Sequence, residues 1–98
     1  MAKDDDRIAR RVTVAGRVQG VWFRGWTVEN AQARGLDGWV RNRADGTVEA
    51  LFAGPRARVA DMIDACRRGP PLARVEALAD EPAEDAGNTG FVQRPTET

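Results

Sequence analysis

Residues 11–24 have the sequence RVTVAGRVQGVWFR and join a predicted strand to a predicted helix. Valines alternate with other residues as far as Ala15, which is typical of a strand, and glycines follow at positions 16 and 20. Glycine lets the backbone bend tightly where a Cβ would clash. Such a bend before a helix can aim several N–H groups at one point, because the first N–H groups of a helix have no partner inside it. By itself, the segment fits an anion-binding loop and an ordinary strand-to-helix connection equally well.

Arg24 stands directly after this loop, at the predicted start of the helix. Its planar guanidinium matches the oxygens of a phosphate group, and the positive end of the helix dipole favours the same anion. A lone arginine at such a position is more typical of a solvated helix surface. The combination of the loop with Arg24 favours a phosphate-binding site.

Strand and helix patterns alternate along the rest of the chain. The expected elements, in chain order, are a strand from about Ile8 or Arg10 to Ala15, a helix from about Arg24 to Arg34 that stops at Gly35, strands at 36–42 and 47–53, a helix from Pro55 to Arg68, a strand at 74–79, a polar loop at 81–90 and a short edge strand at 91–94. The order β-α-β-β-α-β with a short extra strand predicts an α+β ferredoxin-like sandwich. Its sheet is expected to be antiparallel, with both helices on one face.

The length of 98 residues fits one domain, expected over residues 8–94, with a disordered tail at 1–7 and a second tail at 95–98. Lys+Arg and Asp+Glu both number 15, so the formal net charge is zero. This balance argues against a nucleic-acid partner, as does the absence of paired aromatic residues in a strand. No apolar run approaches the roughly 20 residues that span a bilayer, and no apolar signal segment opens the chain. A cytoplasmic monomer without a membrane partner is therefore expected.

The sequence contains no histidine, which excludes a histidine general base, a catalytic triad and a histidine-ligated metal site. Cys66 is the only cysteine, so the chain cannot form an internal disulfide, and its place on the apolar face of a helix predicts an inert core thiol. The acidic run Asp4-Asp5-Asp6 lies in the predicted tail, where consecutive side chains do not converge on a metal. Neither a metal nor a cofactor is expected.

Asn42 ends a predicted strand just before the turn signal Asp45-Gly46. An asparagine at such a position usually caps the local backbone of the turn. A functional role requires its amide to lie beside the loop that precedes Arg24, and the sequence does not set that distance.

Several segments resemble the acylphosphatase family: residues 16–24 with Thr27, residues 35–36, residues 38–42, residues 45–49 and the sequence GPPLARV at 69–75. The resemblance covers about Arg11 to Val75 and implies a ferredoxin-like fold, in agreement with the order of elements. It also implies that the chain hydrolyses acyl phosphates to a carboxylate and inorganic phosphate without a metal or cofactor. Inorganic phosphate would then be both product and inhibitor. Trp22 departs from the family pattern, because a smaller residue is common there.

The resemblance implies roles for individual residues. Arg24 would be the phosphate-binding arginine, Asn42 would position the attacking water, and Thr27 would support this asparagine. The backbone N–H donors to the phosphoryl oxygens would come from the loop residues Gln19, Gly20, Val21, Trp22 and Phe23. The alternative is a non-catalytic anion-binding or regulatory module on the same sandwich, which has no need of Asn42.

Overall fold

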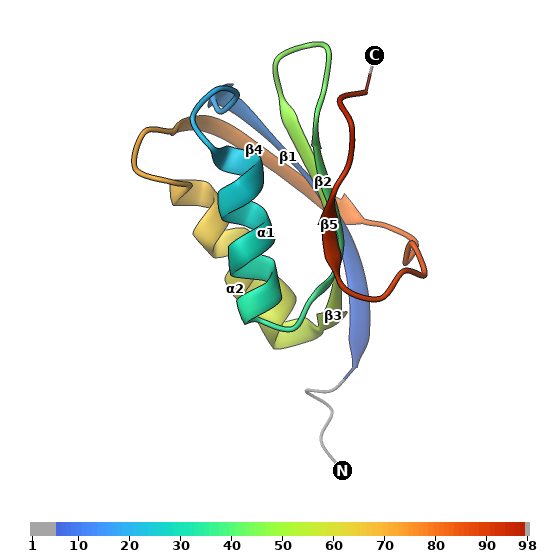
Figure 1. Ribbon diagram of the computed structural model, residues 1–98. Coiled ribbons are helices and arrows are strands. Elements are labelled where there is room, and N and C mark those ends of the chain that lie inside the picture. The colour runs from blue at the N-terminus through green and yellow to red at the C-terminus, as the bar shows by residue number, and fades with distance from the viewer. Residues whose placement is uncertain (1–5, 98) are drawn as a thin grey trace.

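The computed structural model describes residues 6–97, which form five strands and two helices (Figure 1). In chain order the elements are β1 (Arg7–Arg17), α1 (Phe23–Ala33), β2 (Asp37–Asn42), β3 (Val48–Pro55), α2 (Arg56–Arg68), β4 (Arg74–Pro82) and β5 (Phe91–Gln93). The predicted order β-α-β-β-α-β with a short extra strand is confirmed, and so is the ferredoxin-like α+β sandwich. Residues 1–5 of the predicted N-terminal tail lie outside the described residues, while Arg7 already belongs to β1.

The strands form one sheet in the order β4-β1-β3-β2-β5. The pairs β1–β3, β1–β4 and β2–β3 are antiparallel, as predicted, but β5 pairs with β2 in parallel. The expectation of a fully antiparallel sheet is therefore wrong at this edge, and the sheet is mixed. The reason lies in the connection: β4 runs opposite to β2, and the chain reverses through residues 83–90 before it reaches the other edge (Figure 1). After that reversal β5 can only run in the same direction as β2.

Both helices cover one face of the sheet, and the apolar core lies between the two layers (Figure 1). The buried face of α2 is the predicted one, with Val59, Met62, Ile63 and Cys66. The central strand β3 contributes Val48, Ala50 and Phe52 to the same core. Since strand side chains alternate, Glu49 and Leu51 of β3 point to the opposite face. The two faces of the sheet therefore differ: one is apolar and covered by helices, and the other carries a buried charge.

The ends of α1 and α2 follow from particular residues. Gly35 has φ 67°, and its N–H donates to the Gln32 carbonyl while that of Leu36 donates to the Ala31 carbonyl. This Schellman motif ends α1 as predicted and turns the chain toward β2. Pro55, expected in the first turn of α2, instead ends β3, and the helix begins at Arg56.

β4 is three residues longer than expected, so Glu81 and Pro82 belong to a strand and not to the polar loop. The polar residues at its end remain in register with β1, through the pairs Arg11↔Glu81 and Arg10↔Pro82. Arg10 and Arg11 form ion pairs with Asp80 and Glu81, which stabilise charged residues in a strand that composition alone marks as loop.

The residues after β5 continue along the edge of β2 and do not lie apart from the domain. The Arg94 N–H donates to the Val40 carbonyl at 2.8 Å, and the Glu97 N–H donates to the Asn42 carbonyl at 2.9 Å. Glu97 also forms an isolated parallel bridge with Arg43. Residues predicted as a C-terminal tail are thus bound to the end of the strand that carries Asn42. Neither helix within residues 6–97 has the length and apolar character needed to cross a membrane.

Candidate functional site

The loop between β1 and α1 is anchored by its own residues. Val18 and Val21 are buried in the core and hold the loop against the sandwich. Gly20 and Trp22 have φ 78° and 69°, in the left-handed region that suits glycine but costs a tryptophan about 1 kcal/mol. These conformations turn the chain sharply, so that α1 begins at Phe23 directly beneath the loop.

The start of α1 is open to an anion. Trp22 is the N-cap residue but makes no capping hydrogen bond through its side chain, and the first turn contains no acidic residue. The first helical hydrogen bond runs from the Trp26 N–H to the Trp22 carbonyl at 3.0 Å. The N–H groups of Phe23, Arg24 and Gly25 precede this bond, so an anion can accept hydrogen bonds from them.

A pocket of about 200 Å³ lies over this helix start. Its walls are formed by Val18, Gly20, Trp22, Phe23, Arg24, Gly25, Asn42 and Gln93. The structure therefore brings five of the residues predicted for the site to one cavity. Of the other three, Val21 is buried in the core, while Gln19 and Thr27 lie outside the pocket lining.

Arg24 supplies positive charge to the pocket. Its side chain is half-buried, and within residues 6–97 it forms neither an ion pair nor a side-chain hydrogen bond. Its neighbour Gly25 leaves room for the Trp22 indole, because a Cβ at position 25 would lie 2.1 Å from the indole nitrogen. Trp22 is 57% exposed and forms the outer wall of the pocket.

Asn42 reaches the same pocket from the end of β2. Its Oδ1 atom is buried and accepts no hydrogen bond from the described part of the chain. A buried carbonyl oxygen without a donor costs about 1–3 kcal/mol, so a water molecule or a ligand hydroxyl at this position would be stabilising. Asn42 thus offers an acceptor where Arg24 and the helix start offer donors.

The side chain of Gln19 explains how the end of β2 comes so close to the loop. Its Nε2 donates to the carbonyl oxygens of Arg43 and Thr47, both at 2.9 Å, and so fastens the loop to the β2–β3 hairpin. Asp45 closes the turn by accepting from the Thr47 hydroxyl and N–H, and these hydrogen bonds hold the pKa of Asp45 below its usual value. These hydrogen bonds explain why Asn42 lies beside the loop, which the sequence alone did not determine.

Thr27 is fully buried, and its hydroxyl donates to the Phe23 carbonyl one turn earlier, at 2.7 Å. Among the hydrogen bonds of residues 6–97, none joins Thr27 to the side chain of Asn42, so its supporting role remains a prediction. Gln93 lines the pocket but was not foreseen. Its position depends on the parallel pairing of β5 with β2, opposite Val40, for which the sequence gives no signal.

Within the described residues, no group of three or more His, Cys, Asp or Glu side chains is arranged to hold a metal ion. Cys66 is buried on α2, as predicted, and burial raises the pKa of its thiol to about 12. The polar groups of the candidate site are backbone N–H groups, the Arg24 guanidinium and the carboxamides of Asn42 and Gln93.

Comparison with known proteins places the chain in a family. The family model described as acylphosphatase matches residues 10–93. A protein named acylphosphatase from Rhizorhabdus wittichii is 60% identical over 91 residues, which cover 93% of this chain and 92% of the relative. Another of that name, from Rhodospirillum rubrum, is 60% identical over 85 residues, which cover 87% and 93%.

Solved structures agree. An acylphosphatase from Coxiella burnetii superposes with a TM-score of 0.87 at 30% identity, covering 95% of this chain and 100% of that one. The resemblance inferred from a few segments thus extends over nearly the whole chain. The chain belongs to the acylphosphatase family.

Proposed function

We propose that the chain hydrolyses acyl phosphates to a carboxylate and inorganic phosphate, and that the reaction takes place in the pocket over the start of α1. Family membership and the names of the relatives support the reaction. One observation carries the assignment to this pocket: Arg24 and Asn42 line the same small cavity, although they come from different elements.

The phosphoryl group binds at the helix start. Its oxygens accept hydrogen bonds from the loop and helix N–H groups between Gln19 and Arg24, and the Arg24 guanidinium neutralises their charge. Arg24 can serve this purpose because no carboxylate within residues 6–97 pairs with it. Donors fixed in advance around a phosphoryl group stabilise the charge that develops in the transition state.

Asn42 orients the water molecule. Its free Oδ1 accepts a hydrogen bond from the water and holds the water oxygen toward phosphorus. The water oxygen then forms a bond to phosphorus as the bond from phosphorus to the acyl oxygen breaks. The bonding electron pair leaves with the carboxylate.

The reaction needs no proton donor from the protein, because a carboxylate is a good leaving group. An amide cannot take up a proton at neutral pH, so the proton of the water passes to a phosphoryl oxygen of the substrate. Such chemistry depends on positioning and charge stabilisation, and we predict that it proceeds without a metal.

The test is an assay with benzoyl phosphate in the presence of a chelator. We expect equal amounts of benzoate and inorganic phosphate, unchanged turnover with chelator, and competitive inhibition by phosphate. A non-catalytic anion-binding module would bind phosphate but leave benzoyl phosphate intact. The cytoplasmic location and the monomeric state remain predictions, and sedimentation over a range of protein concentrations tests the second.

A further inference from the structure

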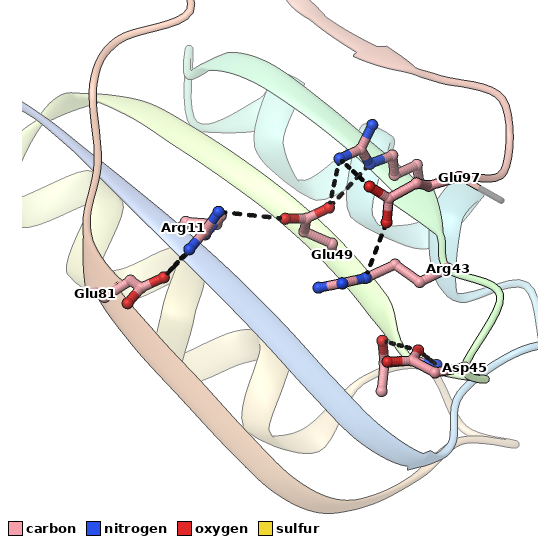
Figure 2. Close-up of polar contacts among 8 residues, drawn as sticks. Arg11, Arg43, Asp45, Glu49, Glu81 and Glu97 are labelled. Atoms are coloured by element: carbon pink, nitrogen blue, oxygen red, sulfur yellow. Dashed lines mark hydrogen bonds and ion pairs between the residues drawn. The ribbon is translucent and has the colours of Figure 1, made fainter.

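The sheet face opposite the helices carries a chain of charges that reaches the residues on both sides of Asn42 (Figure 2). Glu49 lies at its centre with a side chain only 4% exposed. Arg41 donates to one oxygen of Glu49 at 2.9 Å, and Arg11 lies 3.8 Å from the other oxygen. A buried carboxylate needs such partners, so Arg41 is held firmly in place.

Glu97 extends this chain of charges to three consecutive residues. Its carboxylate lies 3.4 Å from the Arg41 guanidinium and 3.1 Å from Nε of Arg43. Its backbone N–H donates to the carbonyl of the residue between them, Asn42, at 2.9 Å. Figure 2 shows Glu97 directly above Arg43 and beside Glu49.

The geometry of a strand relates these contacts to the pocket. Arg41 and Arg43 point to the open face of the sheet, and Asn42, between them, points to the face covered by the helices. One neighbour of the Asn42 backbone is Val48 of β3, in the sheet register. On the other side β5 pairs only as far as Val40, so Glu97 is what holds the outer edge at Asn42.

We propose that Glu97 is a positioning residue for the reaction: by fastening Arg41, Asn42 and Arg43, it fixes the direction in which the Asn42 amide points into the pocket. Glu97 does not line the pocket, so it acts only through Asn42. This inference rests on the proposed role of Asn42 in orienting water.

Two substitutions remove the contacts in steps. Glu97→Gln removes the negative charge but keeps the backbone N–H, whereas Glu97→Pro also removes the donor to the Asn42 carbonyl. Glu81→Gln is the matched control, because Glu81 forms an ion pair with Arg11 on the same face but does not contact residues 41–43. Circular dichroism checks that each variant is folded.

We expect kcat to fall about threefold for Glu97→Gln and about tenfold or more for Glu97→Pro, because small displacements of a positioning group are costly. The inhibition constant of phosphate is expected to stay within about twofold, since the loop and Arg24 are untouched. Glu81→Gln is expected to match the unsubstituted protein in both quantities.

The decisive measurement is the same pair of substitutions in an Asn42→Ala background. If Glu97 acts through Asn42, Glu97→Pro causes no further loss of kcat there. An equal loss in both backgrounds, a parallel rise in the phosphate inhibition constant, or an unchanged kcat in Glu97→Pro overturns the role of Glu97. Full activity of Asn42→Ala by itself overturns the proposed role of Asn42 in orienting water, and the role of Glu97 with it, whereas absence of benzoyl phosphate hydrolysis by the unsubstituted protein would overturn the proposed function.

Discussion

The loop before α1 and the end of β2 face the same pocket but are held in place differently. The loop is fixed by its own residues, through buried Val18 and Val21 and the left-handed Gly20 and Trp22. The end of β2 is held by the adjacent strand β3 and by two residues distant in the sequence, Gln19 and Glu97.

This difference separates two kinds of dependence. Phosphate binding relies on a contiguous segment, so it should survive changes elsewhere that leave the core intact. Orientation of the water relies on contacts between segments far apart in sequence, so it should respond to changes that never touch the ligand. Single substitutions can test this division, and the largest effect is expected at Arg24.

Arg24→Ala removes the only side-chain charge in the pocket lining. We expect kcat/KM for benzoyl phosphate to fall by about 10³-fold or more, and phosphate to lose its inhibition, because ground state and transition state both lose the guanidinium. Arg56→Ala is the control, since Arg56 is an exposed arginine at the start of the other helix. Undiminished phosphate inhibition in Arg24→Ala would contradict the assignment.

Asn42→Ala separates catalysis from binding. We expect kcat to fall by roughly 10²- to 10³-fold, the cost of losing one oriented group, while the phosphate inhibition constant stays nearly unchanged. Asn88→Ala is matched to it, because Asn88 also has a buried Oδ1 without a partner in the described chain but lies outside the pocket. Normal turnover with weakened phosphate binding would reverse the two roles.

Gln19→Leu tests the contact between the loop and the β2–β3 hairpin. The leucine keeps most of the volume but loses both hydrogen bonds to the hairpin carbonyls. We expect kcat to fall about tenfold, with a smaller change in phosphate affinity, because the hairpin moves relative to a loop that retains its own anchors. Steady-state kinetics with phosphate as inhibitor measure both. Equal losses in the two quantities would show that the loop depends on the hairpin after all.

Cys66 lies in neither the loop before α1 nor the end of β2, so it should affect neither phosphate binding nor turnover. Burial raises the pKa of its thiol to about 12 in the folded protein, from an ordinary value of 9.0. Since the folded pKa is the raised one, the contribution of the thiol to the free energy of unfolding is complete below pH 9 and declines as the pH rises from 9 toward 12. Urea unfolding of the protein and of Cys66→Ala, at pH 8 and pH 10, measures this decline. Between the two pH values the free energy of unfolding should fall more for the protein with the thiol than for Cys66→Ala. Equal losses in the two proteins would argue against this pKa.

Local patterns predicted most of the fold. The alternation in β1, the apolar face of α2 and the stop at Gly35 are all properties of short segments, and the structure agrees with each. The parallel pairing of β5 and the length of β4 were missed. Both depend on which strand lies alongside, and no local pattern contains that information.

The same limit applies to the candidate site. The loop and Arg24 stand together in the sequence and could be interpreted from chemistry alone, whereas the role of Asn42 in positioning water came only from the family resemblance. Gln93 and Glu97 could not be found at all. In sequence they are ordinary polar residues near the end of the chain, and they gain significance only from pairing with β2.

The mixed sheet also leaves two unlike outer margins, and each discourages the addition of strands from another molecule. On one side β4 exposes Glu76 and Glu81 and ends at Pro82. On the other, β5 has three residues and is followed closely by Pro95. Charge, proline and short length are the means by which proteins avoid edge-to-edge aggregation, so even a crowded solution of this folded enzyme should resist fibril growth from its sheet edges.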